Sequence, residues 1–531
     1  MLILQDVAYA HPNKDMLFSD INLAVNAGDK IALIGNNGSG KSTLLQLIAG
    51  GLQPSAGSIK TSKTPYYLPQ VFGNFNHYSI ARALQVEEKL YALQSILAGD
   101  VSEKNLALLN DDWNIEERCK EAFAYWHLNV KDVHKAMNTL SGGEQTRILL
   151  AGIMIHNPEI VLLDEPSNHL DAEARAMLYE YMRLSKQAMV IVSHDRTLLN
   201  ILDKMCELHA DGLHVYGGNY DFYVEQKMIE RNAFNEELNN KEKELRKAKE
   251  TERATMERRQ KLDARGKKKQ EKAGLPTISM NTFKNNAEKS TSRTKNMHAE
   301  KVQSISKELN QLRNEQSGVS TMKLELNHSK LHKGKLLINA KDINCAYGET
   351  LLWKQDISLQ VVCGERIAVK GGNGSGKTTL IKMLLGNKLP HTGRIEKAKL
   401  KTFYIDQDYA LIDNRLSVFE QAQQFNATAM AEHEIKSRLT RFLFTNTYWD
   451  KSCSVLSGGE KMRLILCCLT IHHQAPDIIV LDEPTNNLDI QNMEILTAAI
   501  NEYDGTLLVI SHDEYFLDQI RVERSIDLGE K

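Results

Sequence analysis

The chain has 531 residues, enough for roughly three to four domains. It is 42% hydrophobic and 25% charged, as globular proteins are, and its net charge of -2 means that any surface for nucleic acid must be local. No apolar run is long enough for a membrane span, and the N-terminus lacks the basic segment of a signal peptide. The 7 cysteines form no C-x-x-C pair, so we expect a reducing, cytoplasmic compartment.

A glycine-rich loop occurs twice, as GNNGSGKS at Gly35–Ser42 and as GGNGSGKT at Gly371–Thr378. Both copies fit the phosphate-binding pattern G-x-x-x-x-G-K-[ST]. Each copy lies between a strand-like and a helix-like apolar run: Ile31–Ile34 and Thr43–Ile48 for the first, Ile367–Val369 and Thr379–Leu385 for the second. One copy alone could be an ordinary glycine turn at a helix start, but two copies in the same context favour nucleotide sites.

The two loops supply the first group of expected ATP ligands. Lys41 and Lys377 would reach the β- and γ-phosphates, and Ser42 and Thr378 would bind Mg²⁺. The loop residues expected to contact ATP are Gly35, Asn36, Asn37, Gly38, Ser39, Gly40, Lys41, Ser42, Thr43, Gly371, Gly372, Asn373, Gly374, Ser375, Gly376, Lys377, Thr378 and Thr379.

Further motifs repeat in both halves, in one order and with nearly one spacing. They are LSGGE at 140–144 and 456–460, the acidic pair of LDEP at 164–165 and 482–483, and SHD at 193–195 and 511–513. Strand-like and helix-like runs alternate throughout, which favours parallel sheets in α/β domains. We expect two P-loop cassettes, at 1–225 and 336–531, joined by a helical linker at 226–335.

The first half is longer than the second between these motifs. About 21 extra residues separate Gln70 from Ser141, compared with Gln407 and Ser457, and they fall within 80–128. This segment is charged and has a helical period. It is either an arm-like helical insertion or a lengthened surface segment without a role of its own, since insertions at the surface cost little.

The linker predicts a pair of helices. Gln226–Lys272 is rich in Lys, Arg and Glu and almost free of Gly and Pro, which predicts a long exposed helix. Gly274–Asn296 is polar and has no clear pattern. Val302, Ile305, Leu309 and Leu312 then follow at the spacing of a helix-pair seam, so we expect a returning, antiparallel helix. A solvated charged tether is the alternative, but a tether needs no such seam.

A basic run lies beside the expected tip of this helix pair. Its residues Arg265, Lys267, Lys268 and Lys269 are candidates for contact with the phosphate backbone of RNA.

The acidic pairs carry the expected chemistry. Asp164 and Asp482 would hold Mg²⁺, directly or through water. Glu165 and Glu483 would polarise the attacking water, because adjacent residues at a strand end face different ways. The remaining candidates are His194 and His512 for the γ-phosphate, Gln70 and Gln407 for the metal and the water, and Tyr9 and Tyr347 for stacking on the base. A place in the core is the alternative for the two tyrosines.

LSGGE gives each half a second anion site, because a serine and two glycines precede a helix. One nucleotide does not need two phosphate sites in one domain, so we expect the halves to face each other head to tail. Each ATP would then lie between the phosphate loop of one half and LSGGE of the other, and hydrolysis would let the halves part. The expected partners are Ser457, Gly458, Gly459 and Glu460 for the first loop and Ser141, Gly142, Gly143 and Glu144 for the second.

These motifs resemble the ATP-binding cassette superfamily over nearly the whole chain. Two cassettes, a long charged helical linker and no membrane segment resemble the ABC-F family within it. The resemblance implies ATP and Mg²⁺ as cofactors, ATP hydrolysis, and a monomer that pairs its own cassettes without a membrane partner. It further implies binding to the ribosome, with the linker directed to tRNA and ribosomal RNA. Some members relieve ribosome-targeting antibiotics, and others serve translation.

The sequence departs from the family pattern at three places. The insertion within 80–128 is short for the arm with which members touch the ribosome, and Lys370 replaces the apolar residue common before the phosphate loop. The chain ends shortly after the second SHD, unlike members that bind DNA through a terminal coiled coil. Two other functions stay open, an ATPase subunit of a transporter with separate membrane partners and a DNA-associated ATPase.

Overall fold

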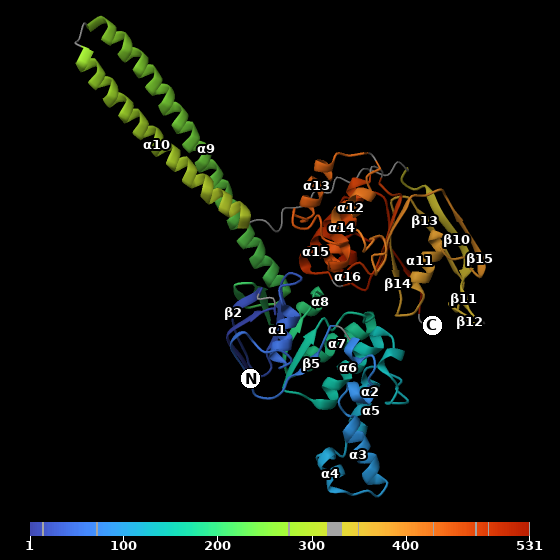
Figure 1. Ribbon diagram of the computed structural model, residues 1–531. Coiled ribbons are helices and arrows are strands. Elements are labelled where there is room, and N and C mark those ends of the chain that lie inside the picture. Colours follow the sequence, from blue (N-terminus) through green and yellow to red (C-terminus); the bar gives the residue numbers. More distant parts are fainter. Residues whose placement is uncertain are drawn as a thin grey trace. The chain divides into compact units, whose positions relative to one another are not determined.

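The computed structural model describes residues 1–12, 15–70, 73–273, 277–315, 332–348, 350–427, 429–472, 475–486 and 488–529. The side chains of Lys267, Lys268, Lys269 and Tyr347, all expected site residues, lie outside the described set. The chain forms two compact units, one of Met1–Tyr223 with Met322–Lys531 and one of Val224–Thr321. The first unit contains both cassettes, and the second is the helical linker (Figure 1).

The first cassette combines a mainly parallel sheet, a smaller antiparallel sheet and helices. Its described strands are β1 (Leu2–Ala10), β2 (Met16–Val25), β3 (Lys30–Ile34), β4 (Ala56–Thr61), β5 (Tyr66–Leu68), β6 (Ile160–Asp164), β7 (Ala188–Val192), β8 (Lys204–His209) and β9 (Gly212–Tyr216). Its helices are α1 (Lys41–Ile48), α2 (Ile80–Ala83), α3 (Glu87–Leu97), α4 (Glu103–Leu109), α5 (Ile115–Tyr125), α6 (Gly142–His156), α7 (Ala172–Leu184) and α8 (Arg196–Leu199), with 3₁₀ turns at Gly73–Phe75 and Met137–Thr139. The main sheet has the order β5-β6-β7-β3-β8-β9, parallel except for β9, and the smaller sheet has the order β2-β1-β4.

The second cassette repeats this plan. Its described strands are β10 (Leu336–Asn344), β11 (Ala346–Tyr347), β12 (Thr350–Leu351), β13 (Ile357–Val362), β14 (Arg366–Lys370), β15 (Thr392–Lys397), β16 (Thr402–Ile405), β17 (Ile478–Asp482), β18 (Thr506–Ile510) and β19 (Arg524–Asp527). Its helices are α11 (Lys377–Leu385), α12 (Val418–Gln424), α13 (Glu432–Arg441), α14 (Gly458–Ile471), α15 (Ile490–Glu502) and α16 (Glu514–Gln519), with a 3₁₀ turn at Cys453–Val455. The parallel sheet has the order β16-β17-β18-β14-β19, and the antiparallel sheet has the order β13-β10-β15.

Burial explains why these runs form parallel strands. Every residue of β6, β7, β17 and β18 is buried, as expected for sheets covered on both faces. In each cassette the phosphate-loop strand, β3 or β14, lies between two parallel neighbours. The predicted α/β cassettes are thereby confirmed, and the loops that follow these strands are held at the carboxyl edge of the sheet.

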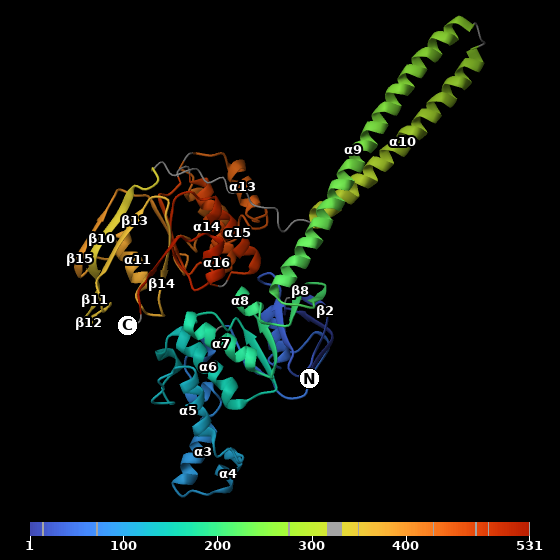
Figure 2. The ribbon, with the colours of Figure 1, turned by 180° about the vertical axis from the view of Figure 1, so that it is seen from behind.

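The segment 80–128 of the first cassette, within which the extra residues fall, is helical. It contains α2, α3, α4 and α5, of which α3 and α4 pack together. Figures 1 and 2 show α3 and α4 at one end of this cassette, beyond α2 and α5. Tyr91 of α3, at 66% exposure, and Trp113, between α4 and α5, at 48%, leave aromatic surface uncovered.

The linker is an antiparallel pair of helices, α9 (Tyr220–Ala273) and α10 (Thr277–Glu315), which lie side by side in Figures 1 and 2. Ile305 and Leu309 of the predicted seam are almost fully buried. Ion pairs cross between the helices, with 2.7 Å from Lys241 to Glu308. The helix α10 also includes 277–296, most of the polar segment that has no clear sequence pattern.

Two properties of the described residues agree with the composition. All seven cysteines are buried, including the adjacent pair in α14. Within the described ranges, no helix combines the length and apolar character needed to cross a membrane.

Candidate functional site: two paired nucleotide cavities

The phosphate loops join β3 to α1 and β14 to α11. Gly40 and Gly376, which precede these helices, have φ of 97° and 96°. A Cβ atom at Gly40 would lie 2.7 Å from Leu17, and one at Gly376 would lie 2.6 Å from Leu352. Both the left-handed backbone and the close approach therefore require glycine.

The loop lysines are nearly buried and are held by their own loops. Lys41 Nζ donates to the carbonyls of Gly35, at 2.7 Å, and Asn36, at 3.1 Å. Lys377 Nζ makes the same contacts with its loop and lies 3.1 Å from His512 Nε2. Burial lowers the pKa of both ammonium groups, and the nearby glutamates, Glu165 and Glu483, oppose that shift.

The strand-end aspartates fit a magnesium ion. Asp482 Oδ2 accepts hydrogen bonds of 3.0 Å from Thr378 and from Tyr404, while its Oδ1 is buried without a hydrogen-bond partner among the described residues. Asp164 Oδ1 is unpartnered in the same way, and Ser42 hydrogen-bonds to this carboxylate. A carboxylate and a hydroxyl beside a phosphate loop are a usual donor set for Mg²⁺ bound with a nucleotide.

Each following glutamate has a left-handed backbone, with φ of 52° at Glu165 and 50° at Glu483. The turn lets the Glu165 N–H donate to the Val192 carbonyl, at 2.8 Å, and the Glu483 N–H to the Ile510 carbonyl, at 2.9 Å. Burial raises the pKa of both carboxyl groups. The same left-handed backbone occurs at both sites, which indicates that the strain is part of how each site works.

The two histidines face these glutamates. His194 Nε2 lies 3.4 Å from Glu165 Oε1, and His512 Nε2 lies 3.4 Å from Glu483 Oε1. Burial, with a smaller contribution from the loop lysines, lowers the pKa of His194 to about 3 and that of His512 to about 4. Both imidazoles are therefore neutral at physiological pH, and each can donate one hydrogen bond and accept another.

Two cavities bring the motifs of opposite cassettes together. The first, of about 440 Å³, is lined by Asn37, Gly38, Gly40, Lys41, Ser42, Thr43, Gln70, Asp164, Glu165 and His194 of the first cassette and by Ser457 and Gly458 of the second. The second, of about 600 Å³, is lined by Asn373, Gly374, Ser375, Gly376, Lys377, Thr378, Thr379, Gln407, Asp482, Glu483 and His512, together with Ser141, Gly142 and Gly143 of the first cassette. Each cavity thus has the head-to-tail composition that the sequence suggests.

Direct contacts join the cassettes beside these cavities. The Asn37 N–H donates to Asp489 Oδ2 at 2.9 Å, and Asn373 Nδ2 donates to the His169 carbonyl at 2.8 Å. A Cβ atom at Gly143 would lie 2.8 Å from that carbonyl oxygen, so the second glycine of LSGGE is required by close approach. Asp489 and His169 lie outside the residues singled out in the sequence.

Several expected residues have a different local role. Glu144 and Glu460 close capping boxes at the starts of α6 and α14, where their carboxylates accept from Ser141 and Ser457. Gly459 packs against Asn492, and does not line the first cavity.

The tyrosine expected to stack on the base of the first ATP packs beside the cavity. Tyr9 lies against Phe18 and meets the edge of the His11 ring, with centroids 5.8 Å apart. His11 itself lines the cavity. His11 is not among the residues expected from the sequence. Its position two residues after Tyr9 is the signal that could have identified it.

The structure explains the unusual Lys370. Its Nζ lies 2.7 Å and 2.9 Å from the two carboxylate oxygens of Glu514, the residue that follows the second SHD motif. The corresponding positions of the first half hold Ile34 and Arg196, so the ion pair is specific to the second cassette.

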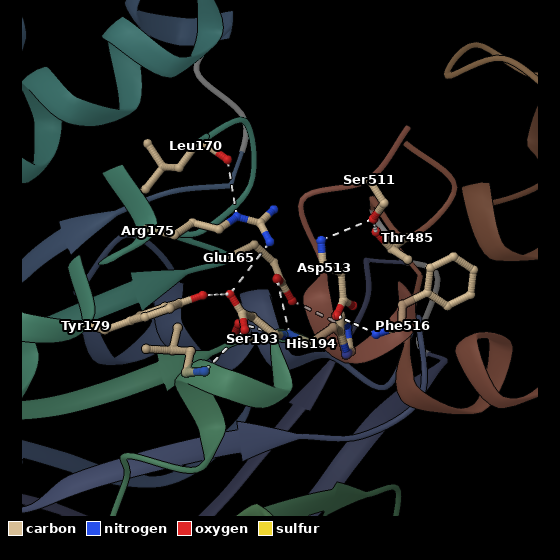
Figure 3. Close-up of polar contacts among 12 residues, drawn as sticks. Glu165, Leu170, Arg175, Tyr179, Ser193, His194, Thr485, Ser511, Asp513 and Phe516 are labelled. Atoms are coloured by element: carbon tan, nitrogen blue, oxygen red, sulfur yellow. Dashed lines mark hydrogen bonds and ion pairs between the residues drawn. The ribbon is translucent and has the colours of Figure 1, made fainter. Parts of the chain in front are cut away.

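A third polar cluster lies at the boundary of the cassettes. Arg175 Nε donates to the Leu170 carbonyl at 3.1 Å (Figure 3). Tyr179 and Arg175 both approach Asp195. Asp513 of the second cassette lies beside this group in the same view, and its pKa is raised by burial.

Comparisons with known proteins give the same class. A family model described as "ABC transporter" matches residues 18–168 and 354–486. The chain is 30% identical to "Probable ATP-binding protein YbiT" of Escherichia coli O157:H7, over 100% of this chain and 98% of that protein. It is 29% identical to "ABC transporter F family member 5" of Arabidopsis thaliana, over 96% of this chain and 72% of that protein. It is also 30% identical to "ATP-binding protein Uup" of Haemophilus influenzae, over 96% of this chain and 76% of that protein.

Solved structures share the fold. A complex titled "Crystal structure of the complex of archaeal ribosomal stalk protein aP1 and archaeal ribosome recycling factor aABCE1" matches with a TM-score of 0.60 at 20% identity, over 98% of this chain and 87% of that chain. "RNase-L Inhibitor" matches with the same score and identity.

Fold and paired cavities together define an ATPase with two ATP-binding cassettes in tandem, joined by a helical linker. The relatives narrow this class further. The chain belongs to the ABC-F family of the ATP-binding cassette superfamily.

Proposed function

We propose that this ABC-F protein is an ATP-driven factor that binds the ribosome and acts on translation through its helical linker. The linker is the observation that carries the proposal. The pair α9 and α10 is long, charged and held by a buried seam at Ile305 and Leu309. ATP binding does not need such a pair, whereas a factor that acts at a distance from its ATPase does.

Charge supports RNA as the partner of the linker. Arg265 is exposed on α9, within the run RGKKKQEK, whose other side chains lie outside the described set. Clustered Lys and Arg bind the phosphate backbone by releasing counterions. We infer that this run contacts ribosomal RNA or tRNA.

The printed titles of solved neighbours point the same way without carrying the proposal. One names an archaeal ribosome recycling factor and another is "Model of ribosome-bound archaeal Pelota and ABCE1". Their identities of 20% and 18% relate them to this chain by fold alone. The proposed function therefore rests on membership of the ABC-F family and on the linker.

In the proposed cycle, Lys41 and Lys377 bind the phosphates of two ATP molecules, and LSGGE of the opposite cassette closes over each. Mg²⁺ would be held by the aspartate and hydroxyl of each site and would neutralise charge on the phosphates. Glu165 and Glu483 orient and polarise the attacking water, and the neutral histidines hydrogen-bond the γ-phosphate. The proposal describes a cytoplasmic monomer that pairs its own cassettes, and relief of an antibiotic is a special form of it.

The experiment compares ribosome binding with and without ATP. We expect the double variant Glu165→Gln, Glu483→Gln to bind ATP without cleaving it, because the amide cannot act as a base. The variant should then co-sediment with ribosomes in ATP and not in ADP. The matched control is Glu180→Gln with Glu502→Gln, exposed glutamates of α7 and α15, which should cycle as the wild type does.

Equal sedimentation with ATP and with ADP would contradict the proposal. Recovery in the membrane fraction would favour the transporter subunit, and binding to branched DNA without ribosome binding would favour the DNA-associated ATPase. Susceptibility of a host to ribosome-targeting drugs, with and without the protein, tests antibiotic relief.

A further inference from the structure

The two nucleotide cavities differ in one charge. Arg175, in the first turn of α7 of the first cassette, lines the cavity that contains Lys377, Glu483 and His512 of the second. It lies eleven residues after Asp164, which belongs to the acidic motif of the first half.

The same position in the second half holds an apolar residue. Counted from Asp482, it is Met493, in the first turn of α15. Met493 is 3% exposed and packs in the core of its own cassette. Among the described residues, none of α15 lines the first cavity. The internal repeat therefore breaks at a residue that one cavity uses and the other does not.

The guanidinium of Arg175 is fixed from its own cassette. Its side chain is 11% exposed, its Nε donates to the Leu170 carbonyl at 3.1 Å, and its Nη1 lies 3.9 Å from Asp195 Oδ2. Figure 3 shows it extending from α7 toward Asp513 of the second cassette. An arginine has five N–H donors, and the bond to Leu170 occupies one, so the group can still bind an anion.

The charge of Arg175 reaches the second site. Its side chain lines the same cavity as Glu483 and His512. A fixed positive charge in a site shielded from water stabilises the negative charge of a phosphate chain far more than an exposed one does.

We propose that Arg175 of the first cassette acts in trans and supplies a fixed positive charge to the triphosphate in the second cassette's site. The first cassette's site has the apolar Met493 in the corresponding place. Cleavage of ATP at the second site therefore depends on Arg175, and cleavage at the first does not. This inference concerns the ATPase alone and stands whether or not the linker acts on the ribosome.

The test measures each site separately. Glu165→Gln leaves only the second site able to cleave ATP, and Glu483→Gln leaves only the first. Single-turnover cleavage, with full-length protein in excess over labelled ATP, follows the chemical step in each background without requiring the cassettes to reopen. We expect Arg175→Met to slow cleavage about tenfold or more in the Glu165→Gln protein and less than about twofold in the Glu483→Gln protein.

Two further variants separate charge from support of the loop at Leu170. Arg175→Lys keeps the charge, and Arg175→Gln keeps a donor for the Leu170 carbonyl but loses the charge. We expect the lysine variant to recover part of the rate at the second site and the glutamine variant to recover none. Arg183→Ala, an exposed arginine of the same helix, is the control and should leave both sites unchanged.

Three results would overturn the proposal. These are equal slowing in the two backgrounds, no slowing at the second site, or a glutamine variant that is as fast as the wild type. Thermal unfolding of every variant, measured in parallel, identifies any that fails to fold. If Arg175→Met proves unstable, the comparison of the lysine and glutamine variants decides alone.

Discussion

At the scale of single residues, the glutamates after the acidic strands carry the clearest strain. Glu165 and Glu483 have left-handed backbones, which cost an L-residue about 1–2 kcal/mol. Their N–H groups are bound to the neighbouring strands, so the turn is fixed by the sheet. The same strain in two independent copies, at the two expected general bases, indicates that the turn is needed to aim the carboxylate.

This strain predicts that, at Glu165, a glycine variant is more stable than an alanine variant, which reverses their usual order of stability. Glu165→Gly and Glu165→Ala both remove the buried carboxylate, but only alanine must keep an unfavourable φ. We expect the glycine variant to be more stable by about 1 kcal/mol, measured by chemical denaturation in the absence of nucleotide.

The matched control lies on a regular helix. At Glu180, an exposed residue of α7, alanine should be the more stable replacement, by about 1 kcal/mol. A glycine variant at 165 that is no more stable than the alanine variant would show that the left-handed backbone is not strained.

At the scale of elements, the linker depends on a narrow seam. Ile305 and Leu309 are 4% and 3% exposed, while the ion pairs between α9 and α10 lie at the surface. Surface ion pairs contribute little, about 0–1 kcal/mol each, so the seam supplies most of the association.

Truncation of the seam should therefore loosen the linker. We expect Leu309→Ala to destabilise the helix pair by about 2–5 kcal/mol and to speed amide hydrogen exchange in α10. Leu262→Ala, the same change at a residue of α9 that is 55% exposed, is the control and should leave exchange unchanged. Equal exchange in the two variants would mean that the seam does not hold the pair.

The sequence predicts local structure and the pairing of motifs between cassettes, but not several individual contacts, for a physical reason. A phosphate loop such as Gly35–Ser42 is specified by glycines and by its own strand and helix, so its pattern is visible in one short segment. The partners Asp489 and His169, and the lining residue His11, depend on tertiary packing and leave no local period. Lys370 gains its meaning only from Glu514, far away in the chain.

The linker, too, could be predicted from the sequence only in part. The helix pair follows from composition and from the seam, whereas the helix over 277–296 lacks apolar periodicity and could not be predicted.

At the scale of the whole molecule, the two cassettes form one compact unit through polar contacts at several places. Arg196, beside the first SHD motif, is 5% exposed and donates to Gln519 of the second cassette at 2.9 Å. Its guanidinium also lies 4.7 Å from the ring centre of Tyr515 and 5.9 Å from that of Tyr220, the first residue of α9. One side chain of the first cassette thus contacts both the opposite cassette and the first residue of α9.

Removal of this side chain should weaken the pairing of the cassettes. Buried arginines at interfaces commonly contribute more than 1 kcal/mol, so we expect Arg196→Ala to raise the ATP concentration for half-maximal closure about fivefold. Fluorescence energy transfer between dyes on the two cassettes measures that concentration. Arg183→Ala serves as the control, and an unchanged midpoint in Arg196→Ala would contradict the role of the residue.

The mismatch between Arg175 and Met493 has a consequence for engineering of the chain. A gene that fuses two copies of the first half would place an arginine at both nucleotide sites, and one that fuses two copies of the second would place methionine at both. Neither symmetric protein would reproduce the natural one, because the order of the two halves decides which nucleotide site receives the arginine.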